Sequence, residues 1–168
     1  MKRGFQIPEF FAGYIGLTAN EELISLLEKN ESETLELYTS IPDDKLNYRY
    51  ASNKWSIKEV MQHITDTERI MAYRALRLSR GDQTPLPGFE QDDYVNNLKI
   101  DHLCKNDIIE EWKTVRTSTI LLFRNLDPLL LDYEGIASGN KVNVELVGRI
   151  IAGHTRHHLI ILRERYLG

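Results

Sequence analysis

The sequence predicts an all-α protein, a four-helix bundle formed by a single domain over residues 1–168. One observation is that apolar residues recur at helical spacing in four segments. These segments lie at about residues 19–40, 57–80, 105–126 and 144–166. A second observation is that residues able to cap a helix stand where these segments begin. The third is the long connection at residues 81–103, which predicts one crossover between the second and third helices.

The N-terminal residues precede the first helical pattern. Residues 1–17 combine aromatic residues with glycine and Pro8, and they predict an irregular arm that packs its aromatic side chains onto the body. The alternative is that this arm forms a wall of a pocket or of a subunit contact. Thr18 and Glu21 have the spacing of a capping box, in which each side chain satisfies a backbone amide at the helix start. Pro42 ends this helix near residue 40.

The second helix, at residues 57–80, has the clearest start in the chain. Ser56 and Glu59 form a capping box, and Trp55 before them can pack against Val60 as a hydrophobic staple. At about 100° per residue, one face of this helix contains Val60, His63, Ile64, Thr67, Met71, Arg74 and Leu78. One of the five histidines therefore lies on the buried face of the second helix.

The remaining connections predict turns and a cap. Residues 81–103 hold prolines and an acidic run, and a connection of this length is commonly functional or a crossover. The third helix ends before Pro128, and residues 129–142 predict a turn-rich link or a small hairpin. Asn143 can cap the fourth helix.

Composition narrows the class of protein. Hydrophobic residues make up 42% of the chain and charged residues 27%, as in ordinary soluble domains. The net charge of −4 argues against a nucleic-acid partner, which needs a basic face. No stretch has the length and apolar character of a membrane span or a signal peptide. The single cysteine, Cys104, fits a reducing compartment, so we expect a cytoplasmic protein without a membrane partner.

The histidines are the candidate functional residues. His154 and His158 lie one turn apart at the centre of the apolar face of the fourth helix, and this spacing lets two imidazoles bind one metal ion. His63 can supply a third ligand from the second helix. A single buried histidine is more often a hydrogen-bonded core residue, but three without partners would each cost about 1–3 kcal/mol. His157, on the flank, is the competing ligand, and His102 in the crossover has no assigned role.

Three imidazole ligands leave at least one coordination position open, whereas a structural zinc site normally has four protein ligands. Zn²⁺, Ni²⁺ and Fe²⁺ all accept imidazole, so the predicted cofactor is a divalent metal of this group. No glutamate follows His154 in the arrangement of zinc proteases, which argues against a peptidase.

Three motifs carry a resemblance to a known family. They are KWSIKEVMQHITD at residues 54–66, PLPGFE at residues 85–90 and GHTRHH at residues 153–158. In order and spacing they resemble the motifs of the metal-binding DinB/YfiT-like superfamily. The resemblance implies a bundle with an up-down-down-up course and a three-histidine metal site at His63, His154 and His158. It also implies a homodimer, and an activity as a metal-dependent hydrolase or as an S-transferase that uses a low-molecular-weight thiol such as bacillithiol or mycothiol.

The leading hypothesis is therefore a metal-dependent enzyme with a small-molecule substrate. The nucleophile would be a metal-activated water in a hydrolase or a metal-held thiolate in an S-transferase. The alternative is a non-catalytic module that binds metal or a small molecule, or assembles as a dimer.

No general base is assigned from the sequence. Asp66 could orient His63, although its angle on the helix favours an ordinary solvated carboxylate. Glu90, Asp92 and Asp93 could form a mobile acidic lid, and the other interpretation is an acidic surface loop. The catalytic residues thus remain open at this point.

Overall fold

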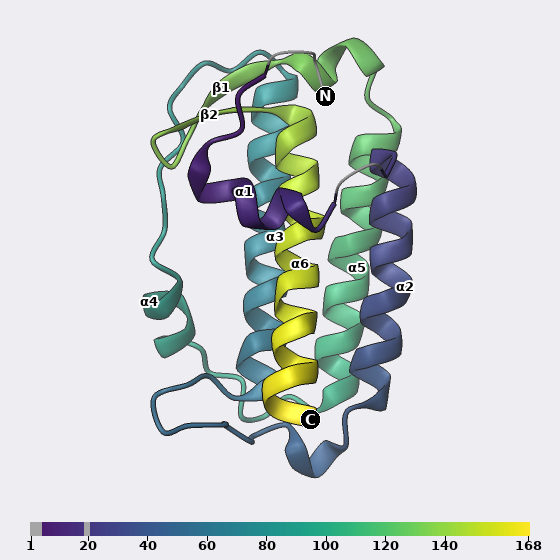
Figure 1. The fold of residues 1–168 in the computed structure, drawn as a ribbon, viewed down its shortest axis with the longest axis vertical. Helices are drawn as coiled ribbons and strands as arrows, with labels where there is room; N and C mark the ends of the chain where they lie inside the picture. Colours follow the sequence, from purple (N-terminus) through teal and green to yellow (C-terminus); the bar gives the residue numbers. More distant parts are fainter. Residues whose placement is uncertain (1–4, 19–20) are drawn as a thin grey trace.

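Four long helices form the bundle predicted from the sequence (Figure 1). In the computed structural model, which describes residues 5–18 and 21–168, they are α2 (Leu23–Ser40), α3 (Ile57–Ser79), α5 (Lys105–Arg124) and α6 (Val144–Ile161). A π-helical segment, η3 (Leu162–Leu167), continues α6. Residues 1–4 of the predicted arm, and residues 19–20 at the predicted start of the first helix, lie outside the described residues. None of the described helices is long and apolar enough to cross a lipid bilayer.

The crossover makes two consecutive helices parallel. Figure 1 shows that α2 and α3 run in opposite directions, whereas α3 and α5 run in the same direction because residues 80–104 return to the other end of the bundle. This connection contains the short helix α4 (Gln91–Asn96), and Leu86 within it forms a parallel bridge with Ala137. α3 and α2 each pack against both α5 and α6. The up-down-down-up course is therefore confirmed.

A small hairpin follows α5, as predicted for the turn-rich residues 129–142. Strands β1 (Glu134–Ala137) and β2 (Asn140–Asn143) pair antiparallel. Ser138 and Gly139 join them with positive φ angles of 50° and 73°, as a two-residue type I′ turn requires. The Asn143 side chain then accepts a 2.7 Å hydrogen bond from the Leu146 amide and caps α6. The remaining short helices in the connections are η1 (Asp43–Lys45) and η2 (Pro128–Asp132).

The prediction of an irregular N-terminal arm is wrong for residues 9–16, because they form the helix α1 (Glu9–Gly16). Phe11 and Ile15, four residues apart, bury one face of α1 and stabilise it against the body. α1 lies across α6 (Figure 1). The two helices approach closely at Gly153, where a Cβ atom would clash with the carbonyl oxygen of Tyr14.

The capping box predicted for the first bundle helix is also wrong. Glu22 caps α2 instead, because its carboxylate accepts a 2.9 Å hydrogen bond from the amide of Ser25. The Thr18 hydroxyl donates backwards to the carbonyl oxygen of Ile15 at 2.9 Å, and so belongs to the end of α1. By contrast, the predicted box of Ser56 and Glu59 at the start of α3 is confirmed.

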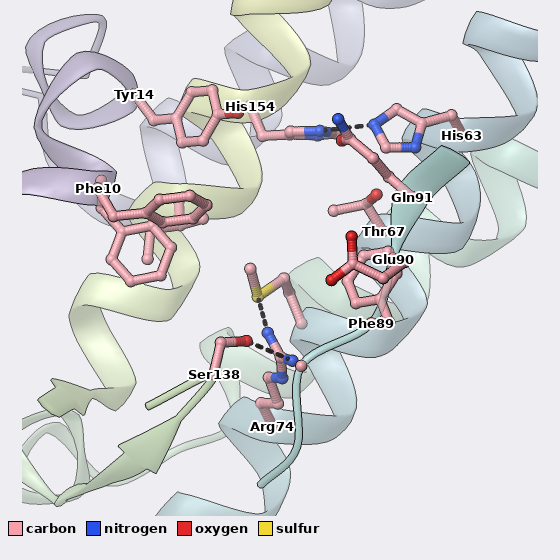
Figure 2. Close-up of a pocket in the computed structure, with 14 residues that line it drawn as sticks. Phe10, Tyr14, His63, Thr67, Arg74, Phe89, Glu90, Gln91, Ser138 and His154 are labelled. Carbon is pink, nitrogen blue, oxygen red and sulfur yellow. Dashed lines mark hydrogen bonds between the residues drawn. The ribbon is translucent and has the colours of Figure 1, made fainter. Parts of the chain in front are cut away.

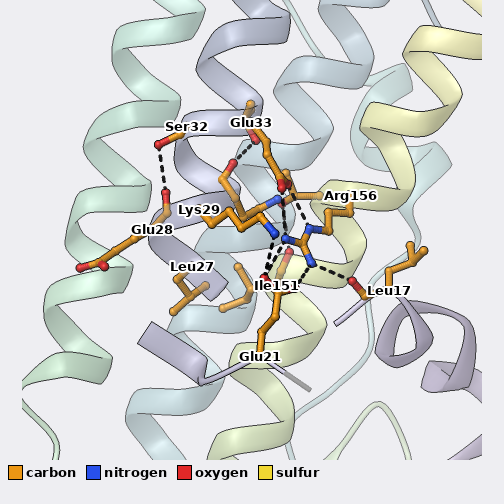
Figure 3. Close-up of polar contacts among 12 residues, drawn as sticks. Leu17, Glu21, Leu27, Glu28, Lys29, Ser32, Glu33, Ile151 and Arg156 are labelled. Carbon is orange, nitrogen blue, oxygen red and sulfur yellow. Dashed lines mark hydrogen bonds and ion pairs between the residues drawn. The ribbon is translucent and has the colours of Figure 1, made fainter. Parts of the chain in front are cut away.

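Arg156 of α6 binds residues at the two ends of the link between α1 and α2, Leu17 and Glu21 (Figure 3). Its Nη1 donates to the carbonyl oxygen of Leu17 at 2.8 Å and to the carboxylate of Glu21 at 2.6 Å. Its Nε donates to the carboxylate of Glu33 at 3.0 Å. The link is thereby tied to the part of α6 that carries the histidines.

The interior has two apolar cores separated by polar side chains. One core fills the end of the bundle near α1 and the hairpin, and the other fills the end near η1 and η3. Between them lie Asn30, Glu68, Arg116 and Thr155, one from each long helix, which we call the polar layer. Arg116 donates to Glu68 through Nε and Nη2, both at 2.8 Å, and to Asn30 at 2.6 Å. The polar layer thus connects all four helices.

Candidate metal centre

Three histidines from two helices meet inside the bundle. The Nε2 atom of His154 lies 3.0 Å from Nε2 of His63 and 3.2 Å from Nε2 of His158. Figure 2 shows His63 on α3 facing His154 on α6 across the interface between these helices. The cap at Ser56 begins α3 two turns before His63, and the Trp55 ring packs beside the His63 ring at 4.8 Å between centroids. The structure therefore brings together the three residues that the sequence predicted as ligands.

The surroundings of these imidazoles keep them neutral. His63, His154 and His158 are 3%, 6% and 9% exposed. Loss of solvent lowers the pKa of His63 to about 4 and holds the pKa values of the other two well below 6.5, where the neighbouring imidazoles lower them further. At neutral pH each ring therefore carries an unprotonated nitrogen, which is the form that binds a metal ion.

The geometry fits a small divalent cation better than a set of hydrogen bonds. An imidazole Nε2 carries either one hydrogen or one lone pair, so that of His154 cannot make two good hydrogen bonds at once. Zn–N bonds of about 2.0–2.1 Å around a tetrahedral ion separate ligand nitrogens by about 3.3 Å. The observed separations of 3.0 and 3.2 Å are close to this value, and the ligand atoms of all three residues lie within 4.8 Å of one another. The residues present therefore fit the metal that the sequence predicted.

The other residues considered from the sequence lie elsewhere. His157 is half-buried on the flank of α6, where its ring contacts Tyr14 at 5.5 Å, and it is not part of the three-histidine group. His102 is exposed in the crossover. Asp66 accepts a 3.2 Å hydrogen bond from Gln62 and lies near Arg69. Both of these side chains also donate to Glu111 of α5, so Asp66 lies on the side of α3 toward α5 and not beside His63.

A cavity of about 640 Å³ opens beside the centre. Figure 2 shows its walls: aromatic residues of α1 on one side, α3 and crossover residues Phe89 to Gln91 on the other, and Ser138 of the hairpin at the end away from the histidines. It is lined by Phe10, Phe11, Tyr14, His63, Thr67, Met71, Arg74, Gly88, Phe89, Glu90, Gln91, Ser138, Ile150 and His154. Glu90 belongs to the predicted acidic segment, which therefore borders the cavity. The alternative prediction, that the N-terminal residues form a wall of a pocket, is confirmed for the aromatic residues of α1.

Tyr14 and Arg74 are cavity residues to which the sequence alone assigned no role. Tyr14 packs its ring against that of His154 at 5.5 Å, and partial burial raises the pKa of its hydroxyl. Arg74 had a signal in the sequence, because it shares the buried face of its helix with His63. An arginine on such a face requires partners or a ligand.

Gly153 provides a test of how α1 is seated beside the centre. We expect Gly153→Ala to lower the free energy of unfolding by about 1–3 kcal/mol, because the added methyl group forces the Tyr14 backbone away from α6. Gly13→Ala in α1 is the matched control, since nothing lies within 4 Å of its added Cβ and alanine favours a helix by up to about 1 kcal/mol. Urea unfolding followed by circular dichroism measures both. Equal stability of Gly153→Ala and the unsubstituted protein would contradict this packing.

The fold and the site define a class of protein, a four-helix bundle with a histidine cluster at a cavity. Residues 26–162 match the DinB superfamily, which is most of the chain. This protein therefore belongs to the DinB superfamily, as the sequence motifs indicated.

Individual relatives agree with this assignment. A curated protein of Oceanobacillus iheyensis, provisionally named the metal-dependent hydrolase OB0413, is 24% identical over 160 residues, covering 92% of this chain and 87% of that protein. YfiT from Bacillus subtilis, described as a probable metal-dependent hydrolase with an unusual four-helix bundle topology, superposes with a TM-score of 0.73. It is 15% identical, and the match covers 98% of this chain and 90% of YfiT.

A third protein of similar fold is a mycothiol-dependent maleylpyruvate isomerase, with a TM-score of 0.69 and 10% identity. The match covers 82% of this chain but only 58% of the isomerase, so this chain spans little more than half of that protein. At these identities the two structural comparisons establish the fold alone.

Proposed function

We propose that this protein is a metal-dependent enzyme for small organic molecules, in which His63, His154 and His158 hold one divalent cation of the Zn²⁺, Ni²⁺ or Fe²⁺ group. The proposal rests on one observation: three neutral imidazoles meet at the wall of a large cavity. The Nε2 atom of His154 lies 3.0 Å from that of His63 and 3.2 Å from that of His158. A histidine cluster that served only to stabilise the core would have no need of such a cavity.

The chemistry follows from the ligand set and the lining. When bound by three imidazoles, a divalent cation acts as a Lewis acid and lowers the pKa of a coordinated water or thiol. The aromatic rings of Phe10, Phe11 and Phe89 exclude water from the apolar part of a ligand. The Tyr14 hydroxyl is protonated at neutral pH, and burial raises its pKa further, so it can donate a hydrogen bond to a substrate oxygen.

Hydrolysis is the reaction we favour, because the relative from Oceanobacillus iheyensis and YfiT both carry descriptions as metal-dependent hydrolases. Thiol transfer is the second candidate. It is favoured by the similarity of fold to a mycothiol-dependent enzyme. In that reaction a low-molecular-weight thiol would enter the same cavity and attack an electrophilic substrate.

The test compares metal-loaded protein with the same protein after chelation. We expect at least one ester or amide of a small acid to be cleaved, or a thiol to be consumed with an electrophile, only while metal is bound. Activity should return when Zn²⁺, Ni²⁺ or Fe²⁺ is added back. Stoichiometric metal without hydrolysis or thiol consumption would favour a non-catalytic module, and activity that survives complete chelation would refute the proposal.

A further inference from the structure

We propose that Arg74 forms a carboxylate-binding subsite at the end of the cavity away from the histidines, and that the substrate is a small organic acid. This inference names the substrate class and so rests on the proposed function, although the subsite itself can be tested without metal. Figure 2 shows Arg74 and Ser138 at one end of the cavity and the His63–His154 pair at the other.

Arg74 is buried in a cavity wall without a charged partner. The residue is only 3% exposed, yet it lines the cavity. Its Nη2 donates to the carbonyl oxygen of Pro87 at 2.7 Å and to the Ser138 hydroxyl at 3.0 Å, and its Nη1 contacts the sulfur of Met71 at 3.4 Å. All three acceptors are uncharged, and a thioether is a weak acceptor. The guanidinium therefore has no anion to offset the loss of its hydration.

The contrast with the other buried arginine supports this interpretation. Arg116 is fully buried, and Glu68 neutralises it with two hydrogen bonds of 2.8 Å. For Arg74, no carboxylate among the described residues lies within ion-pairing distance. Glu90 borders the same cavity, but it is exposed to solvent at the start of α4. A buried charge without an ionic partner at a cavity is a candidate site for a ligand of opposite charge.

The surrounding backbone holds the subsite in shape. Ser138 adopts the left-handed conformation in the hairpin turn, with φ of 50°, and its amide donates to the carbonyl oxygen of Leu86 at 3.0 Å. Hairpin and crossover are therefore joined beside the Arg74 guanidinium. An arrangement built from three separate segments is preorganised before any ligand arrives.

The position of Arg74 sets the shape of the ligand. His63, Thr67, Met71 and Arg74 follow one face of α3, and Arg74 comes eleven residues after His63, or about 16 Å along the helix axis. Aromatic residues line the space between the two ends. The ligand we infer has its carboxylate at Arg74, an apolar body in the middle and its reacting group toward the histidines.

A carboxylate fits this subsite better than a phosphate. The hydrogen-bond donors available to a ligand here are the Nη1 group of Arg74 and the Ser138 hydroxyl. This small number matches the two oxygens of a carboxylate. A phosphate monoester brings three acceptor oxygens and nearly two negative charges. Glu90, which lines the same cavity, repels such a dianion more strongly than a monoanion.

Calorimetric titration of the full chain with 3-phenylpropionate and 3-phenylpropanamide tests the subsite. Because carboxylates also bind metal ions, the decisive measurements use chelated, metal-free protein. We expect the acid to bind at least about tenfold more tightly than the amide, as a charge-assisted hydrogen bond implies. Arg74→Gln should remove this preference, and Arg74→Lys should retain part of it. Arg77→Gln is the matched control, because Arg77 lies one turn further along α3, outside the cavity lining, and pairs with Asp82.

A second pair of variants decides the question if Arg74→Gln fails to fold. Met71→Glu places a carboxylate where the Met71 sulfur already contacts Arg74, so it should occupy the subsite from within and abolish acid binding. Met71→Gln has the same size as Met71→Glu but no charge, so it should retain the preference for the acid over the amide that Met71→Glu loses. Equal binding of acid and amide, a preference that survives Arg74→Gln, or acid binding by Met71→Glu would overturn the proposal.

The remaining outcomes separate this inference from the proposed function. Tighter binding of phenyl phosphate than of 3-phenylpropionate would overturn the assignment to a carboxylate. If Arg74 controls acid binding but the chain binds no metal, only the proposed function fails. If metal-dependent turnover is found and Arg74→Gln does not change the binding preference for the acid over the amide, only the proposed subsite is refuted.

Discussion

His154→Ala is expected to lower the affinity for Zn²⁺ or Ni²⁺ by more than about 100-fold, because loss of an outer-shell partner alone costs about 10–100-fold. His154 is the central member of the cluster, since its Nε2 contacts those of both His63 and His158. Without it the two remaining imidazoles cannot complete a three-ligand site. Competition titration with a chromogenic chelator measures the affinity, and elemental analysis measures the bound metal.

His157→Ala is the matched control for this experiment. It also removes a histidine side chain, from the adjacent turn of α6, but leaves the three-histidine cluster intact. We expect its metal affinity to stay within a few-fold of that of the unsubstituted protein. An equal loss of metal from both variants would show that His157 is a ligand, and unchanged binding by His154→Ala would refute the centre.

The second large effect is on stability, at the polar layer. Arg116→Met is expected to lower the free energy of unfolding by about 3–5 kcal/mol, because it leaves the Glu68 carboxylate buried without its partner. Asn30 also loses the 2.6 Å hydrogen bond from Nη1 of Arg116. Chemical denaturation followed by circular dichroism gives this quantity.

Two further variants show whether the loss comes from the buried charge. Adding Glu68→Leu to Arg116→Met should recover much of the stability, because no unpaired charge then remains inside. Arg124→Met on the same helix breaks the exposed pair with Glu28 and should cost less than about 1 kcal/mol. Similar losses for Arg116→Met and Arg124→Met would contradict the view that burial makes the first pair important.

Much of the fold followed from local patterns. The four long helices were predicted because apolar residues recur with the period of an α-helix, and the caps at Ser56 and Asn143 were read from short-range chemistry. The long connection predicted a crossover, since a short loop cannot join parallel neighbours. The errors are at the N-terminus. There α1 owes its helix to contacts with α6, and Glu22 displaced Thr18 as the cap of α2.

The same period predicted part of the site. The spacing of four residues placed His154 and His158 on the buried face of their helix, and the structure has both there. Binding of a metal by these residues stays a prediction. The angle of Asp66 on the helix argued against contact with His63, and its partners in the structure are Gln62 and Arg69 on neighbouring turns of α3.

By itself, the sequence determined which faces of the helices are buried and which histidines those faces carry, because rotation along a helix is set by local geometry. Only the tertiary structure decided what these faces meet. The distance between His63 and His154, the pairing of Glu68 with Arg116 and the isolation of Arg74 at a cavity all join residues far apart in the chain. They depend on how the helices cross and on which residues of the connections pack against them, and no local pattern encodes either. What began as a cluster of histidines in the sequence is, in three dimensions, one end of a cavity with an arginine at the other.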